Sequence, residues 1–525
     1  MKALLVDVLG AHEEGRKATL DVIGAGPRSI AGVLHKKGID VNLIPYEEIG
    51  KVEIGKYDIL LVSAMTSDLP ISKKIAEKWN KFNKVGIAGG PIACNPIDPL
   101  IKAKFRICII GEGEETLSEL IDSGFNSLDK IRGLAYLEGG KVKINSLRPL
   151  MPRKIYDSYE PLTNVVKSYP FYWARRVYVE VVRGCSNFFR TRLKLPNGKK
   201  CSNCDNCRSG DLEDRYNCPQ GIPPGCGFCS VPSIFGPPRS RSVEKIVKEV
   251  EGLLREGCKR IVLSGSDILD YGRDLLVDPK PLTNPREPEP NYDVLEELFT
   301  RVTEFPDIER GKAFISVENV KACLVTEKAA KLLGKYFKGA TVHVGCETGS
   351  EEHARLIGRP SSPSEVIRAV KLLRENGLRP YVYFIHGLPG QSYETVEDTV
   401  EVMEKVYEVG AEKVTVYRFR SLPMSAFSSF KTAPPAVKSE LSMRIVSKAR
   451  EINVRSKRAL VGKRLRAIVA SPYHKDKSLL VAYPIKHGPV VLIKRRNSLI
   501  GRLIKVEITN VISDRLVKGR VLSEA

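Results

Sequence analysis

Long hydrophobic runs are absent from this sequence of 525 residues. A helix that crosses a bilayer needs about 20 consecutive apolar residues, and no stretch approaches that length. The first ten residues, MKALLVDVLG, are typical of a short strand and show no signal-peptide cleavage site. The sequence therefore predicts a cytoplasmic protein without a membrane partner.

Acidic residues are scarce near the C-terminus. Residues 455–525 contain 17 Lys or Arg residues and only 4 Asp or Glu residues, in a chain whose formal net charge is +22. A thermophile surface rich in Lys and Arg usually carries Glu in proportion. The imbalance therefore favours a polyanionic partner for this end of the chain, and nucleic acid is the simplest one.

Cysteine, by contrast, is plentiful, with 12 residues. In a cytoplasmic chain this number favours metal or cluster ligation over disulfides. The hydrophobic content of 42% is sufficient for globular cores, and the length corresponds to about three domains.

Three cysteines stand out by their setting. Residues 177–182 (VYVEVV) are typical of a buried strand that stops at Arg183-Gly184-Cys185. Cys226 and Cys229 are spaced so that one turn can aim both sulfurs at one point. Three thiolates suit an iron–sulfur cluster, because a four-iron cluster held by three of them keeps one iron open for another ligand. A zinc ribbon or buried apolar thiols are the alternatives.

The segment around this pair, CGFCSVP followed by GPPRSR at 236–241, resembles the cluster loop of radical SAM enzymes, in particular the methylthiotransferase branch. That family has Cys-x3-Cys-x2-Cys, whereas the first gap is far longer here. We interpret residues 186–225 as an insertion between the first and second ligands. Cys185 is preferred as the first ligand because it follows a strand, and Cys218 is the alternative.

Strands and helices alternate over residues 1–125, which predicts a Rossmann-like parallel sheet with helices on both faces. The glycines of 89–91 and 111–113 then lie at the carboxyl ends of strands, where such sheets bind ligands. The stretches AGGPIACNP and IIGEGEETLSEL resemble the cobalamin-binding domain of many radical SAM enzymes. The Asp-x-His-x-x-Gly motif of that domain is absent, since His12 has the wrong spacing from Asp7. Cobalamin would therefore bind without a protein imidazole, or the domain would serve only as a scaffold. Only Cys94 and Cys108 occur here, so the cluster domain of the methylthiotransferases is not expected.

Residues 126–170 are expected to form a linker. The insertion carries a second group of thiols, at Cys201, Cys204, Cys207 and Cys218. Zinc and a second iron–sulfur cluster both fit this group, and a bound metal would be the main source of order in so polar a segment. The nearby cations would add positive charge beside the site or form an ordinary solvated loop: Arg190, Arg192, Lys194, Lys199 and Lys200.

Residues 171–430 repeat a strand–helix unit six times, which predicts a (βα)6 partial TIM barrel with its active face at the carboxyl ends of the strands. Three segments resemble the methylthiotransferase branch and occur in its order: RIVLSGSDILDYG, GCETGSEEHARLIGR and YFIHGLPGQSYETVED. The α/β fold class therefore has a Rossmann-like domain, this core and a small C-terminal β-barrel.

The resemblance implies a 4Fe-4S cluster on Cys185, Cys226 and Cys229, with S-adenosyl-L-methionine (SAM) on its open iron. One electron from the cluster would cleave the sulfonium and give a 5′-deoxyadenosyl radical. It implies that Ser264, Gly265 and Ser266 bind the SAM amine. Other residues would contact the adenine, the ribose or the amino-acid head: Phe228, Ser316, Glu347, Gly387 and Gly390.

Residues 431–454 are expected to be a linker, and 455–525 contain five short alternating strands that indicate a small closed barrel. The stretch GRLIKVEITNV, followed by LVKGRV, resembles the RNA-binding TRAM domain. Five cations of this tail would contact phosphate: Lys494, Arg495, Arg496, Arg502 and Lys505. Deleting the tail should weaken RNA binding and flatten its salt dependence.

The favoured function is a radical SAM enzyme that methylates an unactivated base carbon in RNA, with tRNA preferred. It would use SAM, a 4Fe-4S cluster and cobalamin, and a ferredoxin or flavodoxin as electron donor. One alternative is a tRNA methylthiotransferase with an auxiliary cluster in the insertion. Another is an RNA-binding protein whose cluster is structural or redox-sensing. The basic tail disfavours a protein or lipid substrate.

Overall fold

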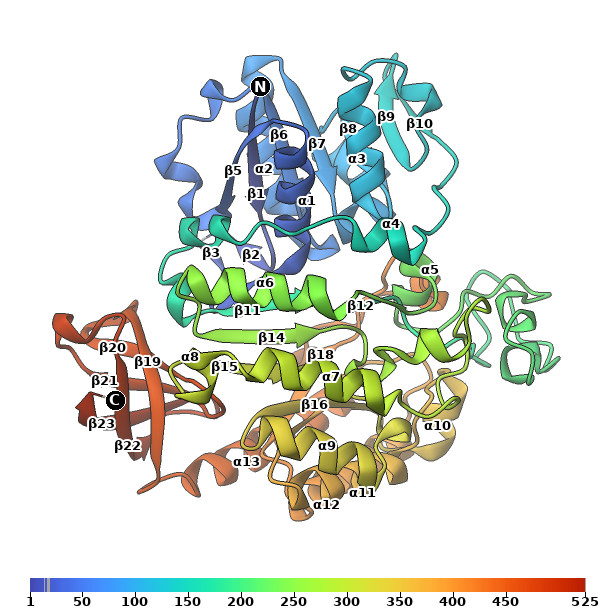
Figure 1. The fold of residues 1–525 in the computed structure, drawn as a ribbon. Coiled ribbons are helices and arrows are strands. Elements are labelled where there is room, and N and C mark those ends of the chain that lie inside the picture. The colour runs from blue at the N-terminus through green and yellow to red at the C-terminus, as the bar shows by residue number, and fades with distance from the viewer. Residues whose placement is uncertain (14, 17–18, 525) are drawn as a thin grey trace. The chain divides into compact units, whose positions relative to one another are not determined.

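The computed structural model describes residues 1–13, 15–16 and 19–524 (Figure 1). The chain forms two compact units, Met1–Val179 with Arg241–Cys258, and Glu180–Ser240 with Lys259–Ala525. Among the described residues, no helix is both long enough and apolar enough to cross a membrane.

The first unit is built on a sheet in the order β10-β9-β8-β7-β6-β1-β5. Its five parallel strands follow the 2-1-3-4-5 order of doubly wound α/β folds. They are β1 (Lys2–Asp7), β5 (Asp40–Pro45), β6 (Ile59–Ser63), β7 (Val85–Gly89) and β8 (Ile107–Ile109). The parallel sheet expected for residues 1–125 is thus present.

Helices cover both faces of this sheet because successive strand residues point to opposite sides. Leu4 and Val62 belong to the core that packs against Ile75 and Trp79 of α2. The alternate residues, such as Leu5, are buried on the other face, and the two helices α1 and α3 contact each other. The bounds are α1 (Ala25–Lys36), α2 (Leu69–Trp79) and α3 (Gly113–Asp122).

The sheet continues beyond residue 125. Residues 126–170, expected to be a linker, therefore include part of the sheet. Strands β9 (Leu134–Glu138) and β10 (Lys141–Ile144) form an antiparallel hairpin that pairs with β8. The hairpin covers an edge that would otherwise leave backbone groups unpaired. The unit then runs on to Val179 and includes α6 (Val243–Arg255).

Helix α6 is joined to this unit by buried charges. The guanidinium of Arg28 on α1 lies 2.7 Å from a carboxylate oxygen of Glu249 on α6, and Arg241 lies 2.6 Å from the other oxygen. The fully buried Arg28 therefore fixes α6 against α1.

The second unit contains two parallel ladders. Strands β14 (Arg260–Ser264) and β15 (Phe314–Val317) form one, and β16 (Thr341–Glu347), β17 (Arg379–His386) and β18 (Lys413–Arg418) form the other. A single bridge, Val320 to Val344, links them. The helices between and after these strands are α7 (Tyr292–Thr303), α9 (Glu327–Phe337), α11 (Pro363–Glu375) and α12 (Tyr393–Glu408). The expected strand–helix repeat is present, as parallel ladders rather than one continuous sheet.

The stretch 431–454, expected to be a linker, instead holds most of helix α13 (Glu440–Arg458). Ile445, Ala449 and Ile452 are buried along one face, and the side-chain amide of Asn453 bonds both backbone groups of Val414 on β18. This helix belongs to the core of the unit.

The C-terminal strands close into a barrel in the order β19-β20-β21-β23-β22. They are β19 (Arg464–Tyr473), β20 (Asp476–Pro484), β21 (Val490–Lys494), β22 (Leu503–Val511) and β23 (Leu516–Glu524). His487 fixes the barrel to the core, because its ring bonds Thr341 at the start of β16 and Glu412 just before β18. The barrel therefore lies at the amino ends of the parallel strands (Figure 1).

Candidate active site

A short strand pair joins the chain just before the insertion to the chain that follows the Cys226–Cys229 loop. Strand β12 (Val182–Arg183) pairs antiparallel with β13 (Arg239–Ser240). The next residue, Gly184, has φ +96°, and a Cβ there would lie 2.2 Å from the carbonyl oxygen of Pro237. Only glycine permits this approach. The amide of Cys185 then donates to the carbonyl of Gly236 at 3.0 Å, so Cys185 returns to the loop of Cys226 and Cys229.

The three thiols lie within electrostatic range of one another. Burial raises the pKa of Cys229 to about 12, and the neighbouring sulfurs of Cys226 and Cys185 add to the rise. Burial also raises the pKa of Cys185, although the positive charge of Lys321 opposes this effect. Cys218, the alternative first ligand, lies instead with the other insertion cysteines. Cys226 is buried, and Cys185 and Cys229 are partly buried. Three thiols crowded in this way ionise readily only when a metal centre compensates their charge.

Two polar side chains donate to these sulfurs. Arg359 donates from Nη1 to the sulfur of Cys226 at 3.3 Å, and Asn187 donates its side-chain amide to the same sulfur at 3.2 Å. The backbone amide of Asn187 also donates to the sulfur of Cys185 at 3.4 Å. N–H donors of this kind stabilise cluster thiolates and tune the reduction potential. The donor set therefore fits a 4Fe-4S cluster held by Cys185, Cys226 and Cys229.

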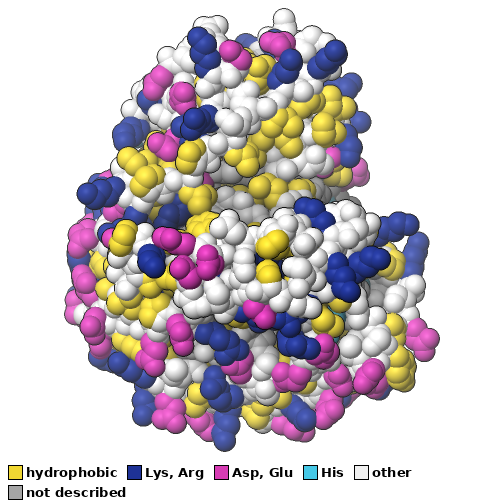
Figure 2. Space-filling model, turned by 90° about the vertical axis from the view of Figure 1, so that its right-hand side faces the viewer, with side chains coloured by type: hydrophobic (Ala, Val, Ile, Leu, Met, Phe, Trp, Pro, Cys, Tyr) yellow, Lys and Arg dark blue, Asp and Glu magenta, His cyan; other side chains and the backbone are white. Residues whose placement is uncertain are grey.

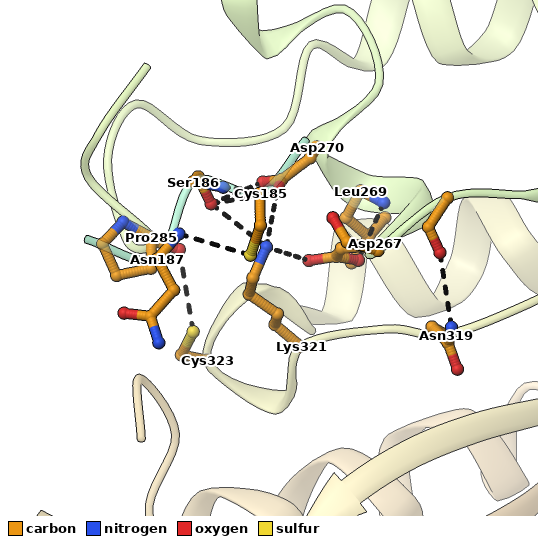
Figure 3. Close-up of polar contacts among 12 residues, drawn as sticks. Cys185, Ser186, Asn187, Asp267, Leu269, Asp270, Pro285, Asn319, Lys321 and Cys323 are labelled. Atoms are coloured by element: carbon orange, nitrogen blue, oxygen red, sulfur yellow. Dashed lines mark hydrogen bonds and ion pairs between the residues drawn. The ribbon is translucent and has the colours of Figure 1, made fainter. Parts of the chain in front are cut away.

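A buried charge cluster holds the chain next to Cys185 (Figure 3). Asp270 accepts the amide and hydroxyl of Ser186, and it pairs with Arg273 and Lys321. Burial opposes the ionisation of Asp270, but Lys321 and Arg273 outweigh it and lower its pKa. Lys321 also lies 3.3 Å from Asp267, whose pKa burial raises. This cluster fixes the backbone that presents the first thiol.

The predicted SAM-amine site follows β14. The carbonyl of Ser264 already accepts from the amide of Val181, and the carbonyl of Gly265 accepts from Asn319 at 3.3 Å. The hydroxyl of Ser266 donates to the carbonyl of Gly184. The three residues therefore tie β14 to the cysteine loop, and their role towards SAM stays a prediction.

Glu347 has an unusual backbone. It ends β16 at a register shift, with φ +73°, a strained left-handed conformation for a residue with a side chain. Burial raises the pKa of its carboxyl group, and Arg359, 3.8 Å away, opposes the rise. Glu347 is thus the ionisable group that strand β16 holds beside the cysteine loop.

Ser316, the other residue predicted at a strand end, lies on β15. Its hydroxyl donates to the carbonyl of Ile261 at 3.4 Å.

The predicted adenine residues lie near two unpaired polar atoms. Gly387 and Gly390 have positive φ. Side chains of other residues already occupy the space that a Cβ atom would need at either position. Phe228 is partly buried in an apolar cluster with Leu388. Among the described residues, Nδ1 of His386 and Nε of Arg359 are buried without hydrogen-bond partners. Such atoms fit a polar ligand at the carboxyl ends of β16 and β17.

The second cysteine group lines one pocket. Cys201, Cys204, Cys207 and Cys218 all belong to its lining, together with Arg190 and Arg192. Arg190, expected to add charge beside the site, is instead buried and donates to the carbonyls of Phe188, Arg215, Tyr216 and Ile222. Figure 2 shows the face that carries the insertion, where Lys and Arg side chains are interspersed with Asp and Glu.

The first unit offers open space at one half of its sheet edge. A Cβ at Gly89 or Gly111 would meet no atom within 4 Å, which fits a ligand above β7 and β8. Above β1 and β5 the edge is filled: Tyr169 donates to Asp7 at 2.8 Å, and Arg16 pairs with Asp7 and Glu47. His12 is exposed. The space at Gly89 and Gly111 is therefore the part of this edge that a ligand could reach.

The five cations predicted to contact RNA are exposed on the C-terminal barrel. They do not join the cysteine site, because the barrel contacts the opposite ends of the strands: Arg260 lies over the ring of Tyr483, and Lys486 over that of Phe314. Strand β17 has 8 residues and spans about 26 Å at about 3.3 Å per residue. A ligand that reaches both places must be large.

Several residues of the site were not predicted from the sequence, among them Asn187, Asp270, Lys321 and Arg359. Asp270 and Lys321 follow strands β14 and β15, so their positions after strand ends were a usable signal. Arg359 lies beyond a helix, and nothing in its spacing from Cys226 indicates their contact.

The family model of the Radical SAM superfamily matches residues 216–403. An uncharacterised protein of Methanopyrus kandleri, MK0932, is 44% identical over 99% of this chain and 96% of its own. The putative methylthiotransferase MJ0865 of Methanocaldococcus jannaschii is 26% identical over 71% of this chain and 70% of its own.

Among solved structures, the fold resembles that of TsrM from Kitasatospora setae, a radical S-adenosylmethionine methyltransferase determined with cobalamin and a [4Fe-4S] cluster bound. The TM-score is 0.59 at 16% identity, and the match covers 82% of this chain and 79% of the other.

Proposed function

The chain belongs to the radical SAM superfamily, and from this premise we propose that it transfers a methyl group to an unactivated base carbon of RNA, with tRNA as the preferred substrate. The observation that carries the proposal is the convergence of Cys185 with Cys226 and Cys229 in a buried loop with N–H donors. The superfamily relation and the methylthiotransferase and methyltransferase relatives make the chain a radical SAM transferase.

The chain's own residues prepare this loop for its cofactors. Cys185, Cys226 and Cys229 would hold a four-iron cluster, with SAM beside Glu347 and the unpaired atoms of His386 and Arg359. When bound, a reduced cluster with SAM supplies one-electron cleavage of the sulfonium, and cobalamin supplies a methyl carrier. The buried charge cluster of Asp270, Lys321 and Arg273 keeps the first thiol in place.

Methyl transfer is preferred to methylthiolation for a reason in the first unit. Its sheet has the doubly wound order, and the glycines at the ends of β7 and β8 leave open space for cobalamin. Within residues 1–125, the described part that forms the parallel sheet contains only Cys94 and Cys108 as thiols, and burial raises the pKa of both. Two thiols of this kind do not form the three-thiolate cluster site of a methylthiotransferase N-terminal domain.

RNA is preferred as the substrate because of the C-terminal barrel. Its exposed cations suit phosphate, and their placement at the amino ends of the strands requires a substrate longer than a nucleotide. A polymer that is held at the barrel and extends to the carboxyl ends satisfies both conditions.

The test is anaerobic reconstitution with iron, sulfide and cobalamin, followed by incubation with methyl-deuterated SAM and unmodified transcripts of archaeal tRNA genes. Mass spectrometry of the digested nucleosides should show a deuterated methyl group on a base. A methylthio gain would support the alternative transferase, and SAM cleavage without label in any RNA would overturn the RNA substrate. If the chain bound zinc in place of iron and did not cleave SAM, the metal would be structural, and the proposal that the chain is an enzyme would be overturned.

A further inference from the structure

We propose that the insertion holds a second four-iron cluster, ligated by Cys201, Cys204, Cys207 and Cys218, which passes electrons to the cluster of the cysteine loop. The ligand spacing supports this choice. The segment has Cys-x2-Cys-x2-Cys, and the fourth thiol is followed by Pro219. Ferredoxins ligate four-iron clusters with this triplet spacing and a Cys-Pro, whereas zinc sites usually pair two ligands with two others further along the chain.

The structure brings the four thiols to one place. Cys201, Cys204, Cys207 and Cys218 all line a single pocket of the insertion. The cysteine triplet and the later Cys-Pro therefore face the same space, as the ligands of one metal centre must.

The protein around the pocket is suited to a net negative cluster. Arg190 gathers four backbone carbonyls of the insertion and its flanks. Arg215 donates to the carbonyl of Cys207 at 2.9 Å, and Arg208 lies over the ring of Phe189. These guanidinium groups organise the segment and place positive charge beside thiolates.

The pocket lies between the surface and the cysteine loop. Cys204 is exposed. On the inner side, Cys201 and Cys218 pack on the apolar cluster that also contains Ile222, Ile357 and Phe228. Ile357 accepts the amide of Gly227, between the two loop cysteines, at 2.8 Å. One apolar cluster therefore joins the two thiol groups.

The number of thiolates determines what the second cluster does. Four protein ligands leave no iron open for SAM, sulfur or substrate, so this cluster only carries electrons. A reductant of the ferredoxin or flavodoxin class gives it one electron. It then returns to its oxidised state by reducing the three-cysteine cluster, and no atom or proton is transferred. This step rests on the proposed function only in requiring an acceptor cluster at Cys185, Cys226 and Cys229.

The first experiment isolates the second site. A variant with Cys185, Cys226 and Cys229 all replaced by Ala is reconstituted anaerobically with iron and sulfide. We expect about four irons per chain and the electron paramagnetic resonance signal of a reduced 4Fe-4S cluster after dithionite. Bound zinc without iron, or no metal, would overturn the proposal. Cys204→Ser changes only one thiol, at an exposed position. Conversion of part of its four-iron cluster to a three-iron cluster, seen in the electron paramagnetic resonance signal, would support the same ligand set.

The second experiment tests the relay by SAM cleavage, which needs no RNA. When Cys201, Cys204, Cys207 and Cys218 are replaced by Ser, the chain should still bind about four irons. With dithionite as the reductant, it should cleave SAM at the normal rate. With a reduced ferredoxin or flavodoxin as donor, cleavage should fall at least about tenfold. Cys94→Ser, in the other unit, is the matched control and should change neither rate. Equal rates with both reductants would overturn the relay, while missing RNA methylation with an intact relay would count only against the proposed function.

Discussion

Nη1 of Arg359 lies 3.3 Å from the sulfur of Cys226, although 133 positions separate the two residues in the sequence. The same guanidinium donates to the carbonyl of Gly345 at 2.6 Å and faces Glu347 at 3.8 Å. Burial opposes its charge, but Cys226 and Glu347 outweigh burial and raise its pKa. Arg359 is therefore charged at any ordinary pH and connects the cluster ligand to the carboxylate beside it.

Replacing Arg359 by Met should make the cluster harder to reduce. The positive charge and N–H donor favour the reduced cluster, which is more negative. We expect the midpoint potential to fall by about 60 mV, a tenfold change for one electron, measured by potentiometry with electron paramagnetic resonance. Arg355→Met, which removes a surface pair with Glu352, is the control, and Arg359→Lys should recover part of the shift. An unchanged potential in Arg359→Met would contradict the role.

The two candidates for the first ligand should behave differently. Cys185→Ala should abolish SAM cleavage with dithionite, because it leaves two thiols in the loop. Cys218→Ala should retain it, since Cys218 lines the other pocket. Iron analysis and the yield of 5′-deoxyadenosine measure both effects. The reverse result would identify Cys218 as the first ligand.

The charge cluster at Asp270 should make stability sensitive to acid. Its pKa is lowered in the folded protein, so its contribution to stability is present above the unfolded value of about 3.9 and is lost as the pH falls through the folded value. Lys321→Met should cost about 3–5 kcal/mol because it leaves buried carboxylates unpaired. Adding Asp267→Asn should restore part of this loss. Melting temperatures at pH 7 give the comparison, and additive losses in the double variant would refute the pairing.

Lys457 should destabilise the protein at neutral pH. It is buried on α13, and burial, reinforced by Lys413, lowers its pKa to about 8. The unfolded chain binds this proton more tightly, so stability rises between the folded pKa and the unfolded value of about 10.4. Lys457→Met should therefore raise the free energy of unfolding at pH 7 by on the order of 3 kcal/mol.

Calorimetry at pH 7 and pH 9.5 should show this gain shrink at the higher pH. Arg458→Met, at the next and exposed position, controls for the loss of a surface cation. A gain for Lys457→Met that is the same at both pH values would mean that the buried charge is not its cause.

Binding of RNA should depend on barrel cations. Replacing Lys494, Arg496 and Lys505 by Ala should weaken tRNA binding and reduce the salt slope by about 2–3, near one unit per phosphate contact. Ala at the exposed Lys331, Lys371 and Lys405 of helices α9, α11 and α12 is the matched control. Point variants are better than deletion of 455–525, because that deletion removes His487 from Glu412 and the last turn of α13. An unchanged slope would exclude these cations from the interface.

Regular elements could be predicted from the sequence, because local patterns determine them. The alternation over residues 1–125 corresponds to the parallel sheet of the first unit, and the alternating pattern of the tail corresponds to strands β19 to β23. Helix α13 was missed although Ile445, Ala449 and Ile452 have helical spacing, since its polar composition resembles that of a linker. The filled half of the first sheet edge was not predictable, because Tyr169 reaches Asp7 from 162 positions away.

The convergence of Cys185 with Cys226 and Cys229 was predictable from the sequence, whereas the surroundings of these thiols were not. The spacing of Cys226 and Cys229 and the strand before Cys185 are local signals. The left-handed conformation of Glu347 depends on the bulge in β16, and the contact of Asn187 with Cys226 depends on how the chain returns after the insertion. Both are consequences of tertiary packing.

The β12–β13 pairing has a consequence for how such proteins are recognised. It locates Cys185 by backbone hydrogen bonds rather than by a fixed interval along the chain, so the three thiols converge despite the long segment between the first and the second. The family match begins at residue 216, downstream of Cys185. A fragment trimmed to that match would therefore lack one of the three thiols proposed as cluster ligands, and searches that demand a rigid three-residue gap will overlook chains arranged in this way.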